Sequence, residues 1–172
     1  MAHHGLAARA ILHTYAHFDH VGATGELQKV TGAPVYLHEG DLPLLQALGM
    51  QARMFGVAEP EAVEVDRFLA DEQTVRVGEL SAAVLHTPGH TPGSLSFLVA
   101  GGPVVSGDTL FAGSIGRSDL WGGDHDALLR SIRDRLLCLD DDTQVVPGHG
   151  PITTIGQEKR WNPFLRGLSS GA

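Results

Sequence analysis

The sequence has little cysteine, no long apolar run and no signal-like start. Cys138 is the only cysteine among 172 residues, which excludes a disulfide within the chain and makes a reducing cytoplasm the default location. The longest apolar runs, such as 94–100, are far shorter than the roughly 20 residues that span a bilayer, so we expect no membrane helix. The opening Met-Ala-His-His-Gly-Leu lacks a basic region followed by an apolar stretch, so we expect no secretory signal.

Basic residues are also scarce. The chain has 12 Lys and Arg against 20 Asp and Glu, which gives a formal net charge of −8. Proteins that wrap nucleic acid or lie on anionic membranes need a surplus of Lys and Arg. The composition therefore argues against both partners and favours a small-molecule substrate.

Apolar material is sufficient for a core. Hydrophobic residues make up 42% and charged residues 19% of the chain, and 172 residues form one domain of ordinary size, which we assign to 1–172. The hydrophobic pattern predicts strands alternating with helices, and a loop at 51–60, which indicates a layered α/β fold. The predicted strands are 10–12, 34–37, 74–77, 82–86, 95–99, 104–105 and 143–146; the predicted helices are 22–31, 41–48, 126–139 and 157–161.

Histidine is unusually frequent, with 10 His against 12 Lys and Arg, and many of the His stand beside Gly, Asp or Pro. Four turns concentrate these residues, and each follows a predicted strand. Scattered His are often plain surface residues, and an isolated Gly-His-Gly is usually just a turn. Four such turns in one chain instead indicate a metal site, because imidazoles and carboxylates on loops between rigid strands can converge on one ion. The four turns are 17–20, 87–94, 106–111 and 147–151.

These motifs resemble the metallo-β-lactamase fold superfamily, and within it the small bacterial glyoxalase II-like hydrolases. The family's His-x-His-x-Asp-His motif corresponds here to 15–20, and the runs 108–120 and 147–165 are similar to that branch. The resemblance implies an αββα sandwich with two metal ions. One ion would take His17, His90 and Asp108; the other would take Asp19, His20 and His149 and share Asp108.

The resemblance also implies the chemistry. A metal-bound hydroxide would attack a carbonyl that the metals polarise, and Asp19 would orient the hydroxide as a catalytic residue as well as a ligand. Zn²⁺ is the expected ion, although iron and manganese suit the same His and Asp ligands. Arg117 lies in a loop that is near the site in the family, but we interpret it as part of a structural ion pair.

The first departure from the family is Tyr15, which stands where the motif has its opening His. A phenol, with a pKa near 10, is a much poorer zinc ligand than imidazole. His13 would lie on the same strand face but about 6.6 Å away, which is too far to compensate. We therefore expect one well-bound metal ion and a second that is weak or absent.

The second departure is at the beginning, because the chain lacks the family's first strands and 5–10 would correspond to the exit of the first helix. The predicted strand 10–12 would then lose a neighbour, and an unprotected strand edge tends to pair with another chain. We expect self-association through this edge, or a start that is truncated or misassigned.

The resulting functional prediction is a metal-dependent hydrolase of thioesters such as hydroxyacyl-glutathione. The alternative is a weakly active or non-catalytic metal-binding relative with a degraded first metal site, which Tyr15 and the short start both favour. The persulfide dioxygenases of the superfamily are disfavoured because Tyr15 removes a ligand from the iron site that they use. The nucleases of the superfamily are disfavoured because the chain is acidic. Only the shared fold supports lactamase activity.

Overall fold

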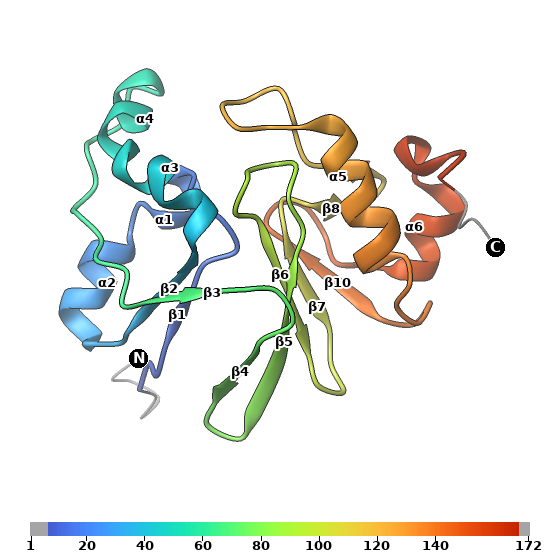
Figure 1. Ribbon diagram of the computed structural model, residues 1–172, viewed down its shortest axis with the longest axis horizontal. Helices are drawn as coiled ribbons and strands as arrows, with labels where there is room; N and C mark the ends of the chain where they lie inside the picture. The colour runs from blue at the N-terminus through green and yellow to red at the C-terminus, as the bar shows by residue number, and fades with distance from the viewer. Residues whose placement is uncertain (1–6, 169–172) are drawn as a thin grey trace.

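The computed structural model describes residues 7–168 as two β-sheets with helices on their outer faces (Figure 1). The smaller sheet is parallel, in the order β1-β2-β3. Its strands are β1 (Ile11–Leu12), β2 (Val35–His38) and β3 (Arg67–Leu69). The helices beside it are α1 (Phe18–Val21), α2 (Thr24–Thr31), α3 (Leu42–Gln46) and α4 (Leu48–Met54).

The larger sheet has six strands in the order β11-β10-β7-β6-β5-β4, and it is antiparallel except between β7 and β10. A separate hairpin, β8-β9, lies beside it. Helices α5 (His125–Ser131) and α6 (Ile155–Trp161) cover its outer face (Figure 1). The strands are β4 (Thr74–Val77), β5 (Leu80–His86), β6 (Leu95–Val99), β7 (Val104–Gly107), β8 (Leu110–Phe111), β9 (Ser114–Ile115), β10 (Gln144–Pro147) and β11 (Thr153–Thr154).

The layering confirms the predicted αββα sandwich. The apolar stripe predicted for 126–139 is the inner face of α5 and of the π-helical turn Ile132–Leu136 that continues it. Leu128, Ile132 and Leu136 are fully buried in the core beneath the larger sheet. Asp124 caps α5 by accepting a hydrogen bond from the amide of Ala127, which satisfies a free donor of the first turn.

Several elements differ from the sequence-based expectation. The predicted loop 51–60 is wrong in its first part, because α4 extends to Met54. Gly49 inside this helix weakens the helical signal, since glycine disfavours helix interiors. The predicted helix 22–31 is α2, which ends at Gly32 in a left-handed conformation, and a separate turn of helix, α1, precedes it. Strands β3, β8, β9 and β11, with two or three residues each, are too short to show a period.

The structure describes only part of the N-terminal region for which a helix exit and an unpaired strand edge were predicted. Gly5 and Leu6 lie outside the described residues, and 7–10 form neither helix nor strand. Within the described chain β1 pairs with β2 alone, so its other edge has no strand beside it. Among residues 7–168, no helix combines the length and the hydrophobicity needed to cross a bilayer.

Candidate metal centre

The four predicted turns meet at one end of the sandwich, where they line a cavity of about 460 Å³. Its size is in the range of small-molecule sites. The first turn follows β1, and the others follow β5, β7 and β10, so strand ends from both sheets supply the side chains. Five of the six predicted ligands line it: His17, Asp19, His90, Asp108 and His149.

His20 and His149 form the tightest part of the cluster with Asp19. The two Nε2 atoms are 3.2 Å apart, and Asp19 Oδ2 lies 3.2 Å from Nε2 of His149 and 3.7 Å from that of His20. Asp108 adds Oδ1 at 3.6 Å from His20 Nε2 and Oδ2 at 3.7 Å from His149 Nε2. In a tetrahedral site with ligands at about 2.0–2.1 Å, neighbouring donor atoms are about 3.3 Å apart. The spacing of the His20, His149 and Asp19 donor atoms therefore fits a single small divalent ion, with Asp108 adjacent to them.

Two buried polar atoms in the centre have no hydrogen-bond partner: His90 Nε2 and Asp108 Oδ1. Such atoms are costly unless something else satisfies them. The Nδ1–H of His90 donates to the carbonyl oxygen of Arg117 at 2.8 Å, and a carbonyl can only accept, so the proton is on Nδ1 and the lone pair of Nε2 is free. This is how metal-binding histidines are commonly oriented. Both atoms thus have the chemistry of metal ligands.

Gly148 shows how closely the candidate ligands are packed around it. A Cβ atom at this position would collide with Asp108 Oδ1 and would lie 2.6 Å from His20 Cε1. The Pro-Gly-His-Gly turn therefore uses glycine next to His149 because a side chain would occupy the ligands' own space.

The other predicted cluster contains His17, His90 and Asp108. His90 Nε2 lies 3.9 Å from Asp108 Oδ2, and the rings of His17 and His90 are 4.8 Å apart. Burial, followed by the charge of His90, lowers the pKa of His17 from 6.5 to about 4. His17 is therefore neutral near pH 7, which is the form that binds metal.

Tyr15 lies among these imidazoles. Its ring centroid is 5.2 Å from that of His17, 4.2 Å from that of His20 and 4.6 Å from that of His90, and it is 1% exposed. Burial, and then the negative charges of Asp108 and Asp19, raise the pKa of Tyr15 above its usual value of 10.0. The residue at the position of the missing imidazole is therefore a neutral phenol.

His13 and Arg117 are engaged elsewhere. His13 is buried away from the cavity lining, and its Nε2 is 3.0 Å from Thr24 Oγ1. Arg117 lines the cavity, but its Nε and Nη2 atoms each donate a hydrogen bond of 3.0 Å to the carboxylate of Asp119. This geometry matches the ion-pair interpretation of Arg117.

Sequence reasoning missed Asp41, which is fully buried and joins two of the metal-site turns. Its Oδ2 accepts from the amide of Ala16 at 2.9 Å and from the hydroxyl of Thr91 at 2.8 Å, while Oδ1 accepts from the amide of Gly93 at 2.6 Å. The carboxylate thereby holds the segment before His17 against the segment after His90. The sequence gives only a weak signal, since an Asp before a leucine-rich helix is typical of a helix cap.

Gln51 is a second missed residue. Its side-chain oxygen accepts from the amide of Phe18 at 3.1 Å, and its nitrogen donates to the carbonyls of Leu44 at 2.8 Å and Ala16 at 3.3 Å. Gln51 therefore ties α4 to the first turn of the metal site. It lies in the region predicted as a loop, where no periodicity marked it.

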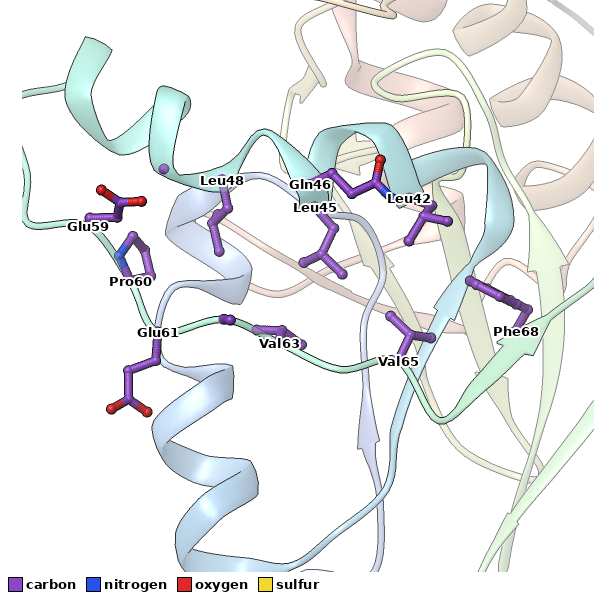
Figure 2. A pocket seen from close by; sticks show the side chains of 12 residues that line it. Leu42, Leu45, Gln46, Leu48, Glu59, Pro60, Glu61, Val63, Val65 and Phe68 are labelled. Atoms are coloured by element: carbon purple, nitrogen blue, oxygen red, sulfur yellow. The ribbon is translucent and has the colours of Figure 1, made fainter.

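A second cavity of about 460 Å³ lies away from this centre, between α3–α4 and the extended segment 59–65. In Figure 2, Leu45, Val63 and Val65 face the space between the helices and the segment. Its described lining contains neither His nor Asp, and its two carboxylates belong to Glu59 and Glu61. This cavity therefore lacks the imidazole donors that the candidate metal centre contains.

Comparison with known proteins agrees with the geometry. The family model of the metallo-beta-lactamase superfamily matches residues 6–149. The chain is 42% identical to a protein named probable metallo-hydrolase YqgX from Bacillus subtilis, over 96% of this chain and 79% of that protein. It is 41% identical to the hydroxyacylglutathione hydrolase GloC of Haemophilus influenzae, over 95% of this chain and 79% of that protein.

Solved structures give the same result. BLEG-1, described as a B3 metallo-beta-lactamase, superposes with a TM-score of 0.90 at 44% identity, over 96% of this chain and 81% of that one. TTHA1623, solved in a di-iron-bound form, gives a TM-score of 0.87 at 48% identity, over 94% of this chain and 80% of that one. These matches confirm the resemblance drawn from the motifs.

Proposed function

Because the chain belongs to the metallo-beta-lactamase superfamily, we propose that it is a metal-dependent hydrolase of thioesters such as hydroxyacyl-glutathione. The observation that carries the proposal is the convergence of His20, His149 and Asp19, whose donor atoms are close enough to bind one ion, with Asp108 adjacent and a cavity of substrate size beside them. The similarity to GloC supports the substrate class.

The superfamily fold implies a divalent metal ion, and we propose Zn²⁺, with iron and manganese as the other candidates. His20, His149, Asp19 and Asp108 would hold it, and His17, His90 and Asp108 would hold any second ion. A bound ion of this kind supplies Lewis acidity and makes water a nucleophile at neutral pH. We propose one tightly bound ion, because Tyr15 leaves the group of His17, His90 and Asp108 one imidazole short.

The protein's own residues orient the reactants. Asp19, with its side chain 38% exposed, is the carboxylate of the cluster most open to the cavity, so its Oδ2 can accept a hydrogen bond from an attacking water. Asp108 is more buried and lies between both groups of histidines, where its negative charge would offset that of a bound ion. A thiolate leaves readily, so the chain does not need a strong general acid.

The test combines elemental analysis with turnover of S-lactoylglutathione by protein that is first metal-free and then reloaded with zinc, iron or manganese. We expect hydrolysis only after reloading. Asp108→Asn should abolish it, whereas Asp140→Asn, at an exposed carboxylate outside the cavity lining, should leave it unchanged. Absence of turnover with all three metals would overturn the proposal and favour the weakly active alternative. A β-lactam assayed in parallel tests the activity named for BLEG-1.

A further inference from the structure

The walls of the metal-site cavity are mainly apolar, and they come from three separate segments. One wall is α1 with α4, another is β8, and the third is the loop before α5. Large side chains on these walls are unusually open to solvent: Met54 is 77% exposed, Trp121 59%, Phe55 57% and Met50 45%. Exposed apolar side chains that gather around a cavity indicate a ligand-binding surface.

The aromatic wall has a defined arrangement. The rings of Phe18 and Phe55 are stacked with centroids 4.6 Å apart at an angle of 29°. Phe18 is adjacent in sequence to the candidate ligands His17 and Asp19. Across the cavity, Phe111 has its ring centroid 6.4 Å from that of His149. Apolar surface therefore begins directly beside the metal ligands.

Charged groups in the cavity do not favour an anionic ligand. Arg117 is the only Lys or Arg in the described lining, and Asp119 already pairs with its guanidinium. The charges of Asp19 and Asp108 would be balanced by the ion that they hold, so the described lining leaves no unpaired basic side chain for a carboxylate of the substrate. The peptide part of glutathione carries two carboxylates and one ammonium, so this lining offers it little and solvent suits it better.

From these observations we propose that the enzyme selects thioesters whose acyl group is apolar and of aromatic size, with the acyl group on the walls and the charged thiol part toward solvent. This inference rests on the proposed thioesterase function. An apolar wall distinguishes substrates by size: each additional methylene in such a pocket changes specificity by about 10-fold or more.

A matched pair of substrates tests the selection. S-Mandeloylglutathione and S-lactoylglutathione differ only by a phenyl in place of a methyl group on the hydroxyacyl carbon. We expect kcat/KM to be about 10-fold or more higher for the mandeloyl thioester. Phe55→Ser and Met54→Ser should each reduce that ratio several-fold. Phe164→Ser, at a residue 53% exposed and outside the cavity lining, is the control and should leave the ratio unchanged.

Binding to the metal-free protein separates this inference from the proposed reaction. The thioethers S-benzylglutathione and S-methylglutathione cannot be hydrolysed, and calorimetry should show the benzyl compound binding about 10-fold or more tightly. Equal binding and equal kcat/KM would overturn the inference while leaving the thioesterase intact. Tighter benzyl binding without turnover of either thioester would instead overturn the thioesterase and keep an apolar ligand site. Loss of the preference in Phe164→Ser would assign it to a surface other than these walls.

Discussion

Tyr15 is the residue that distinguishes this metal centre from the motif of its family. Its buried ring lies against the rings of three histidines that are candidate ligands. A substitution at Tyr15 therefore acts on the metal centre and not on the protein surface. We expect Tyr15→His to raise the tightly bound metal from one ion per chain to two, because imidazole restores the missing ligand. Elemental analysis after dialysis measures this.

Tyr15→Phe is the control, because it keeps the ring and removes only the hydroxyl group. It should retain a single ion. Two ions tightly held by the unmodified protein, as in the di-iron form of TTHA1623, would contradict the expectation.

Asp41 stabilises the centre without lining its cavity. Asp41→Asn removes a charge that accepts three hydrogen bonds and places an amide where the neighbours are donors. We expect the free energy of unfolding to fall by about 2–4 kcal/mol, the range for a disrupted buried charged network. Denaturation in urea measures this, and Asp140→Asn should shift the midpoint little. An Asp41 variant as stable as the parent would show that the two turns hold their positions independently.

His13 makes stability depend on pH. Burial lowers its pKa from 6.5 to about 4, so between these values the unfolded chain binds a proton that the folded chain does not. Stability is therefore fully present above pH 6.5 and is lost as the pH falls toward 4, by an amount on the order of 3 kcal/mol at most.

His13→Gln keeps a polar partner for Thr24 but cannot titrate. Unfolding by urea at pH 7 and pH 5 should show a smaller loss of stability in the variant than in the parent. His17 titrates in the same direction, so a reduced slope is expected, not a flat one. An unchanged slope would exclude His13 as a source of the pH dependence.

At the scale of elements, the unpaired edge of β1 is the feature with the clearest consequence. The amides of Ile11 and His13 bond toward β2, so those of Ala10 and Leu12 point to the free edge. We expect the protein to self-associate there, and sedimentation velocity over a concentration series measures it. Ala10→Pro removes one outward amide while leaving the bonds to β2, and it should weaken the association. A parent protein that stays monomeric at high concentration would contradict this.

The sequence predicted the long elements and the four turns that meet at the candidate metal centre, for physical reasons. A stripe such as Leu128, Ile132 and Leu136 repeats at helical spacing, and a His-rich turn is visible without any partner. The roles of Asp41 and Gln51 could not be predicted, because each is defined by amides more than 20 residues away along the chain. Short strands such as β3 are stabilised by their neighbours in the sheet and carry no period of their own.

For the whole molecule, the centre joins the two sheets. His17, Asp19 and His20 follow β1 in the smaller sheet, whereas Asp108 and His149 follow β7 and β10 in the larger one. A metal ion that binds only the folded protein stabilises it by mass action, about 2.7 kcal/mol at a concentration 100 times Kd. We expect a chelator to lower the Tm by several degrees and zinc to restore it. A Tm that responds to neither the chelator nor zinc would show that no ion binds preferentially to the folded protein.

The described chain passes between the two sheets at one place, in the short connection from β3 to β4. Three of the six candidate ligands precede that connection and three follow it. Neither part of the chain therefore contains all of the candidate ligands. If the chain were cut at 70–73 and the two fragments separated, metal capture would require their reassociation, and uptake would rise as the fragments are mixed at higher concentration.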